Sequence, residues 1–277
     1  MEYILENELA RVVISSKAAE ILSFYKKSDK LEIMWNGNPE YWAGRNPILF
    51  PQVGNTYNKT QVFKGQEYHM GNHGIARHKE FDLIKQTSDE LTLVLKANED
   101  TLKEYPYDFA LYVTYKLTNA KLEISYVIEN NDQDVMPFGF GLHPAFNCPI
   151  ENDEKFEDYY IEFSSKENDN TEELKLIKDS KLALNRELFK KFPTVIYYGL
   201  NSAFVTLSNG KHKVKVTCNG YPVLAFWSPK ESPFICIEPW FSHGDFKEVN
   251  LPFEEREGII SLESNKSFST AYSIEII

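Results

Sequence analysis

The stretch FALYVTYKLTNAKLEISYVI (residues 109–128) contains two runs of alternating apolar and polar side chains around a short polar turn. The apolar positions are Phe109, Leu111, Val113, Tyr115 and Leu117 in the first run and Leu122, Ile124, Tyr126 and Ile128 in the second. A period of two places successive side chains on opposite faces of a strand. The pattern therefore predicts two antiparallel strands joined at Asn119-Ala120, with one face buried and the other exposed.

The same period of two recurs from one end of the chain to the other. It is found in residues 91–95, 159–163, 214–216 and 268–276. Helical signals are few: Asn98 can cap a single turn through Leu102, and residues 186–192 form a second short candidate. Many strands separated by polar turns predict an all-β protein, built as a large antiparallel β-sandwich. No repeat or linker interrupts the pattern, so residues 1–277 are interpreted as a single domain, with the polar run 166–173 as a solvated loop.

The composition restricts the class of partner. The 277 residues include 30 Lys and Arg against 41 Asp and Glu, a formal net charge of -11. Nucleic acids and anionic membranes bind basic surfaces, so neither is an expected partner. No apolar run reaches the ~20 residues of a membrane-spanning helix, and the N-terminus does not resemble a signal peptide. The chain is expected to be cytoplasmic, as a monomer or a homodimer, with its three cysteines buried and reduced.

Four segments break the strand pattern and concentrate Gly, Pro and chemically useful side chains. They are GRNPILFPQVGN (44–55), MGNHGIARHKEF (70–81), FGFGLHPAFN (138–147) and ICIEPWFSHGD (235–245). Loops carried by a rigid sheet are where binding and catalytic residues usually lie. We therefore expect the four segments to converge on one open cleft.

Two residues in these segments are suited to proton transfer. His143 precedes Pro144, which biases it towards an extended conformation, and an imidazole titrates near neutral pH. Glu238 follows four apolar residues, and partial burial would raise its pKa and make it a better base near pH 7. A histidine satisfied within the core and a glutamate paired with an arginine are the alternative interpretations. Trp240 adds a flat apolar face of the kind that packs against sugar rings.

Cationic and imidazole side chains in the other two segments point to a polar ligand. Arg45 and Arg77 are forks that can hold hydroxyls or a phosphate, or can form structural salt bridges. His73 belongs to a group of three histidines within residues 69–78, but the glycines beside it argue against a helical metal-binding pair. We therefore expect no metal. His212, between two lysines, is expected on a solvent-facing strand outside the site.

The order of the motifs resembles a known family. RNPILFP (45–51), HGIAR (73–77), GLHPAF (141–146) and EPW (238–240) follow one another as they do in the aldose 1-epimerase (galactose mutarotase-like) family, and within it in the LacX-like branch. The resemblance covers nearly the whole chain. It implies a β-sandwich of the supersandwich kind, a sugar substrate, no cofactor, and interconversion of α and β anomers of a hexose or hexose phosphate.

The resemblance also implies roles for individual residues. His143 would be the general acid for the ring oxygen, Glu238 the base for the anomeric hydroxyl, and His73 a support for the ring oxygen. Arg45 would bind sugar hydroxyls, and Arg77 matches a position that helps bind phosphate in the hexose-6-phosphate mutarotase branch. Trp240 is expected to contact the sugar.

One feature of the galactose mutarotases cannot be assigned. They bind sugar hydroxyls with an aspartate between the second histidine and the glutamate, and the candidates here are Asp158, Asp169 and Asp179. A non-catalytic sugar-binding protein on the same scaffold remains an alternative. A glycoside hydrolase is a second one, because Asp245 would supply the second carboxylate that such enzymes need.

Overall fold

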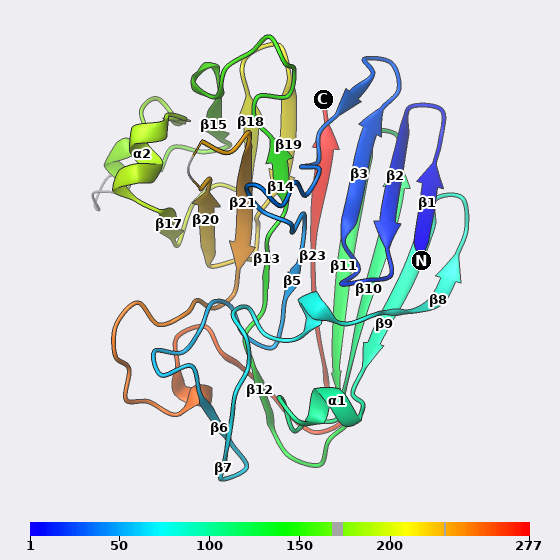
Figure 1. The fold of residues 1–277 in the computed structure, drawn as a ribbon, viewed down its shortest axis with the longest axis vertical. Helices are drawn as coiled ribbons and strands as arrows, with labels where there is room; N and C mark the ends of the chain where they lie inside the picture. The colour runs from blue at the N-terminus through cyan, green and yellow to red at the C-terminus, as the bar shows by residue number, and fades with distance from the viewer. Residues whose placement is uncertain (168–173, 230) are drawn as a thin grey trace.

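Antiparallel sheets make up most of the structure (Figure 1). The computed structural model describes residues 1–167, 174–229 and 231–277. The largest sheet has nine strands, in the order β16 (Lys181–Ala183), β15 (Tyr160–Phe163), β18 (Phe204–Ser208), β19 (Lys213–Thr217), β23 (Ser267–Ile276), β11 (Lys121–Asn130), β10 (Phe109–Thr118), β9 (Glu90–Lys96) and β8 (Asp82–Gln86). The predicted hairpin lies inside this sheet as β10 and β11, paired from Phe109↔Asn130 to Thr118↔Lys121.

Two further sheets pack on the nine-stranded sheet. The first consists of β1 (Glu2–Glu6), β2 (Ala10–Ser15), β3 (Ile21–Lys26) and β4 (Leu31–Glu32). The second consists of β17 (Thr194–Tyr198), β20 (Val223–Trp227), β21 (Phe234–Trp240), β13 (Gly141–Leu142) and β5 (Ile48–Leu49), with β14 (Ala145–Asn147) also paired to β21. In Figure 1 the four-stranded sheet lies in front of β9, β10 and β11. The rings of Phe163 on β15 and Phe226 on β20 meet at 6.2 Å between centroids, where the second sheet packs on the first.

The remaining elements are short. Two small sheets pair β12 (Met136–Phe138) with β22 (Ile260–Leu262) and β6 (Gln61–Phe63) with β7 (Gln66–Tyr68). The helical segments are α1 (Glu99–Leu102), α2 (Arg186–Lys191) and the 3-10 turns η1 (Ala76–His78), η2 (Phe156–Asp158), η3 (Leu174–Leu176) and η4 (Phe253–Glu255). Both predicted helices are therefore confirmed, and each begins after an asparagine whose side chain accepts backbone N–H groups, Asn98 for α1 and Asn185 for α2.

One continuous apolar core joins the sheets and confirms the predicted β-sandwich. It includes Phe24 of the four-stranded sheet, Val113 of the nine-stranded sheet and Ile237 of β21, all fully buried. All seven residues of β21 are buried, so this strand is covered on both faces and shows no alternation of buried and exposed positions. Which strands are covered in this way depends on contacts between residues far apart in the sequence. A central strand of this kind holds any polar side chain that it carries in a desolvated position.

The expectation for His212 is wrong. It lies in the turn before β19 and is only 8% exposed. Its Nε2 is 3.2 Å from a carboxylate oxygen of Glu151 and 3.3 Å from one of Glu154. The two flanking lysines suggested a solvent-facing strand, but the chain turns at this point and points the imidazole inward against these carboxylates.

Other local expectations have mixed outcomes. Cys148, Cys218 and Cys236 are buried free thiols, as predicted. The expected solvated loop over residues 166–173 lies mostly outside the described residues, because the described part stops at residue 167 and resumes at 174. Within the described ranges, no helix is both long and apolar enough to cross a membrane.

Candidate active site

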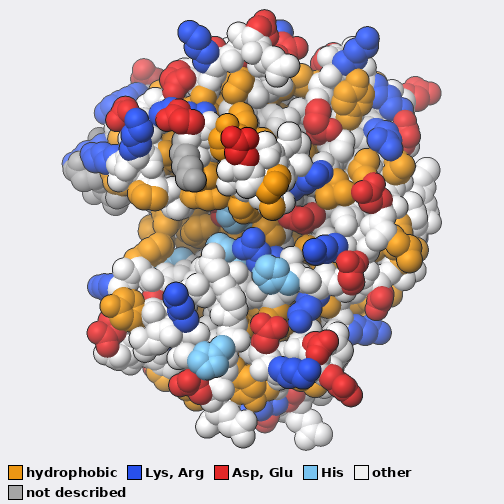
Figure 2. Space-filling model, viewed as in Figure 1, with side chains coloured by type: hydrophobic (Ala, Val, Ile, Leu, Met, Phe, Trp, Pro, Cys, Tyr) orange, Lys and Arg blue, Asp and Glu red, His pale blue; other side chains and the backbone are white. Residues whose placement is uncertain are grey.

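A notch opens between the sheet that contains β17, β20 and β21 and the loops below it in the view of Figure 2. Hydrophobic side chains lie at its edges and histidines at its inner end. Its deeper part is a cavity of about 390 Å³, here called the inner chamber, lined by Trp42, Asn72, His73, Arg77, His143, Thr194, Trp227, Glu238 and Trp240. Three of the four segments predicted to be loops meet there, but the prediction is wrong for residues 235–240, which belong to strand β21 and are buried on both faces. The first segment, 44–55, contributes instead to an adjoining cavity through Val53, Gly54 and Asn55.

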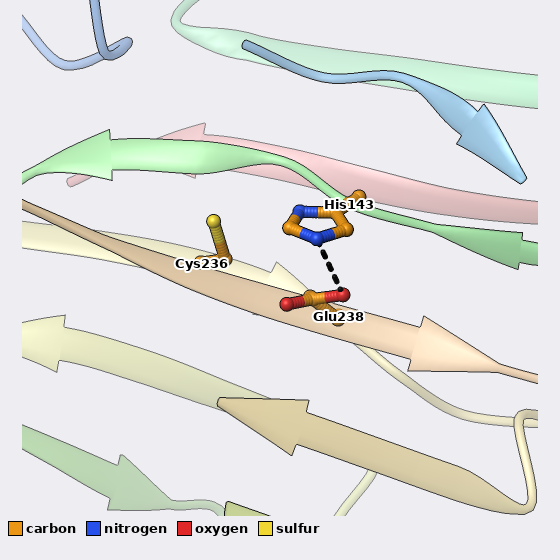
Figure 3. Close-up of side chains that lie close together, drawn as sticks. All are labelled: His143, Cys236 and Glu238. Carbon is orange, nitrogen blue, oxygen red and sulfur yellow. Dashed lines mark ion pairs between the residues drawn. The ribbon is translucent and has the colours of Figure 1, made fainter. Parts of the chain in front are cut away.

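His143 and Glu238 face each other at the floor of the inner chamber (Figure 3). Glu238 lies on β21, and His143 lies between β13 and β14, which both pair with that strand. His143 Nε2 is 3.2 Å from Glu238 Oε2. Apart from this contact, Glu238 Oε2 is buried with no aligned hydrogen-bond partner among the described residues, and the same is true of His143 Nδ1. Buried polar atoms are normally satisfied, so this pair is arranged to meet the polar atoms of a ligand.

Burial shifts both pKa values away from the charged forms. It raises the pKa of the Glu238 carboxyl well above its ordinary range, against the smaller effects of the Trp240 indole and of Arg77. It also lowers the pKa of His143 well below its ordinary range, and His73 and Arg77 act in the same direction. Burial therefore favours the neutral form of each group, a protonated carboxyl and an unprotonated imidazole.

His73 is held as a neutral imidazole with a defined tautomer. The backbone N–H of Gly54 donates to His73 Nδ1 at 2.9 Å, so this nitrogen carries the lone pair and Nε2 carries the proton. Burial, aided by the charge of Arg77, lowers the pKa of His73 to about 3. The ring stands edge-on to that of His143, with centroids 5.5 Å apart. His73 can therefore donate one hydrogen bond to a ligand without a change in its own charge.

The conformation that places His73 depends on the glycine after it. His73 has φ 67° and Gly74 has φ 72°. A Cβ at Gly74 would collide with the carbonyl oxygen of Phe50, which accepts hydrogen bonds from Ile75 and Ala76 at 2.8 and 3.1 Å. This left-handed turn seats the HGIAR segment against residue 50 and directs both His73 and Arg77 into the inner chamber.

Comparison with known proteins identifies the fold and its family. The family model of aldose 1-epimerase matches residues 1–250. The chain belongs to the aldose 1-epimerase family. It is 31% identical to the plasmid-encoded protein LacX of Lactococcus lactis subsp. lactis over 296 residues, which covers 99% of this chain and 98% of that protein.

Two solved structures have the same fold. A galactose mutarotase related enzyme from Lactobacillus acidophilus superposes with a TM-score of 0.91 at 34% identity, covering 100% of this chain and 97% of the other. A galactose mutarotase-like protein from Lactobacillus casei superposes with a TM-score of 0.89 at 27% identity, covering 100% of both chains. The predicted family and supersandwich fold are therefore confirmed.

Within this aldose 1-epimerase fold, five of the six predicted site residues line the inner chamber: His73, Arg77, His143, Glu238 and Trp240. Arg45 does not line it. Its Nη1 donates to the carbonyl of Leu22 at 2.8 Å, and its backbone N–H donates to Glu20. Arg77 is half-buried and forms no salt bridge with another described residue, so its guanidinium is available to a ligand.

The structure adds residues that the sequence motifs did not single out. The rings of Trp42 and Trp227 flank His143, with centroids 4.8 and 5.5 Å away. Asn72 and Thr194 complete the lining. Asn72 immediately precedes the HGIAR motif and Trp42 lies three residues before the RNPILFP motif, so their positions in the sequence were a usable signal. Thr194 and Trp227 enter only because β20 pairs with β21 and β17 pairs with the other edge of β20.

The aspartates considered for hydroxyl binding do not line the chamber. The carboxylate of Asp158, the last residue of η2, accepts a hydrogen bond from the backbone N–H of Lys155. Asp179 lies in an exposed turn. Asp169 lies outside the described residues. Asp245, the possible hydrolase partner of Glu238, instead accepts hydrogen bonds from Arg256 and from the N–H of Tyr57 at 2.8 Å.

Cys236 brings a third potential metal ligand to the acid–base pair (Figure 3). One ligand atom from each of Cys236, His143 and Glu238 lies within 4.8 Å of the others. Burial raises the pKa of the Cys236 thiol well above its ordinary range, and the neighbouring Glu238 adds to the effect. Without a metal the Cys236 side chain is therefore a neutral thiol, and an ion would have to displace its proton in order to bind.

We expect sugar anomer exchange to survive dialysis against EDTA unchanged. Added zinc is expected to inhibit, because coordination would occupy His143 Nε2 and the Glu238 carboxylate, the two groups that the sequence analysis predicts to move protons. Exchange rates measured by NMR before dialysis, after dialysis and after zinc addition provide the check. Activity lost with EDTA and restored by zinc would show that the metal-free prediction is wrong.

Proposed function

We propose that this protein is a mutarotase that interconverts the α and β anomers of a hexose or hexose phosphate. The observation that carries the proposal is the 3.2 Å approach of His143 Nε2 to Glu238 Oε2, both buried and both facing a cavity large enough for a sugar ring. Family membership supports the reaction class.

Ring opening needs one group to take a proton while another donates one. Glu238 as carboxylate removes the proton from O1, and His143 as imidazolium donates a proton to O5 while the C1–O5 bond breaks and a C1 aldehyde forms. Rotation about C1–C2 presents the other face of the carbonyl group. Reversal of both transfers closes the ring as the other anomer, so each group ends in its starting protonation state.

The neutral pair that burial favours already contains the number of protons that the reaction needs. Moving the proton from the Glu238 carboxyl to His143 Nε2 converts the neutral pair into the ion pair that the reaction uses, without exchange with solvent. The His73 N–H and the Arg77 guanidinium can stabilise the bound sugar and the developing charge, because both are desolvated at the same cavity wall. We assign them, with Trp240, to substrate binding.

The pH dependence of kcat/KM follows from the proton count of the pair. Below the lowered pKa of His143 a second proton enters and no acceptor remains, and above the raised pKa of Glu238 the single proton is lost and no donor remains. We expect the acid limb of the profile to lie below pH 6.5, the ordinary value for histidine. An acid limb of the kcat/KM profile centred at or above pH 6.5 would show that the pKa of His143 is not lowered in the free protein.

A screen of anomer exchange tests the activity itself. Saturation-exchange NMR with glucose, galactose and their 6-phosphates should show an enzyme-dependent rate for at least one sugar above the spontaneous background. Binding of these sugars without faster exchange would instead favour the alternative of a non-catalytic sugar-binding protein on this scaffold.

A further inference from the structure

A second cavity adjoins the inner chamber and has almost the same size. This outer chamber has a volume of about 360 Å³ and shares His73, Thr194 and Trp240 with the inner one. Ligand sites typically have volumes of roughly 300–1,000 Å³. The inner chamber alone is sufficient for one hexose, so the outer chamber leaves comparable space for a second group on the same molecule.

Exposed aromatic rings stand at the outer chamber. Tyr57 and Phe246 line it and are 55% and 68% exposed, although both are large apolar side chains. The imidazole of His243 stacks on Phe246 at 5.3 Å between centroids with an interplanar angle of 23°. Exposed apolar patches next to a polar cavity mark binding surfaces. Flat rings supported in this way suit the CH face of a sugar.

The floor of the outer chamber is rigidly joined to the inner one. Two loops pack backbone to backbone, because a Cβ at Gly54 would lie 2.9 Å from the Cα of Gly244. Asp245 N–H donates to the Asn55 carbonyl at 2.8 Å, and His73 N–H donates to the Gly54 carbonyl at 2.8 Å. The loops that carry Tyr57 and Phe246 are thus held in a constant position relative to His73, which lowers the entropy lost on binding.

The charges of the outer chamber favour an uncharged group. Lys59 is the only Lys or Arg in its described lining, and it is exposed to solvent. Asp245 is neutralised by Arg256. A phosphate site would be expected to present a desolvated arginine fork or several cations, as Arg77 does in the inner chamber.

We propose that the outer chamber binds a second sugar ring, so that the substrate of this site is a reducing disaccharide whose free anomeric end occupies the inner chamber. The inference rests on the proposed mutarotase function. Ring opening requires an unsubstituted O1, so the second ring must be attached through another hydroxyl. That ring then lies between Tyr57 and Phe246 while C1 faces His143 and Glu238.

Anomer exchange of disaccharides and of their reducing-end sugars provides the test. Maltose, cellobiose and lactose are compared with glucose, and β-1,4-galactobiose with galactose, by NMR exchange spectroscopy. We expect kcat/KM for at least one disaccharide to exceed that of its reducing-end sugar by about 3- to 10-fold, the contribution of one aromatic contact. Phe246→Ala and Tyr57→Ala should each lower this ratio by a similar factor. Leu251→Ala, which removes a 48% exposed side chain outside both chambers, should leave the ratio unchanged.

The possible failures are distinguishable. The protein could be active on single sugars while no disaccharide has a higher kcat/KM than its reducing-end sugar. That result would overturn the outer-chamber proposal and leave the mutarotase function intact. A preference for glucose 6-phosphate that is lost in Lys59→Ala would assign the chamber to phosphate and would also overturn it. If no sugar shows exchange, the mutarotase function fails, and calorimetry decides the chamber. Tighter binding of a disaccharide that is lost in Phe246→Ala upholds a second-ring site, and equal dissociation constants reject it.

Discussion

Replacing Glu238 with glutamine is expected to lower kcat for anomer exchange by at least ~10²-fold, the usual contribution of a positioned proton-transfer group. The amide has nearly the same size but cannot take the O1 proton. KM should change much less, because the lost interaction belongs to the transition state. The rate is measured by NMR exchange with subtraction of the spontaneous reaction.

Folding of this variant should be preserved or improved. Burial raises the pKa of Glu238 in the folded protein well above its ordinary value of 4.5, so between the two pKa values the folded protein holds this proton and the unfolded chain does not. The stability that depends on this group is therefore lost as pH rises, and glutamine removes that dependence. Glu187→Gln on α2 is the matched control; its side chain is 80% exposed and only forms a surface ion pair with Lys190, so the rate should be unchanged and the melting temperature nearly so. A Glu238→Gln variant that folds and exchanges anomers at a normal rate would exclude Glu238 as the base.

Replacing His143 with asparagine should lower kcat by at least ~10²-fold as well. Asparagine can still form hydrogen bonds but cannot carry a proton to O5. A modest loss of stability is also expected, because the imidazole packs against the rings of both Trp42 and Trp227. Thermal unfolding, followed alongside the exchange rate, separates the two effects.

The control for His143 is His69→Asn, because the His69 side chain is 72% exposed and outside both chambers. His212 is unsuitable for this purpose, since it is buried against Glu151 and Glu154. The double variant His143→Asn/Glu238→Gln should be little slower than the slower single variant, because groups that act as one unit are not additive. Normal exchange in the His143 variant, or fully additive losses, would contradict the paired mechanism.

Local patterns in the sequence were enough for the strands with clear alternation and for the two short helices α1 and α2. The β10–β11 hairpin follows from strict alternation around Asn119, and α1 follows from the capping side chain of Asn98, because both signals act between residues close in the chain. The same local reading was wrong for His212, where the direction of a turn, rather than the flanking lysines, decides what the side chain faces.

The sequence by itself determined the family, the sandwich class and five residues that line the inner chamber, because each lies in a short motif with distinctive chemistry. Only the tertiary structure decided their relation. Pairing of β13, β14 and β20 with β21 brings His143 to Glu238 and adds Trp227, while Arg45 is directed to the Leu22 carbonyl, away from the chamber. The raised pKa of Glu238 and the lowered pKa of His143 also belong to the fold. Desolvation depends on which distant strands cover a residue, and no pattern within one strand contains that information.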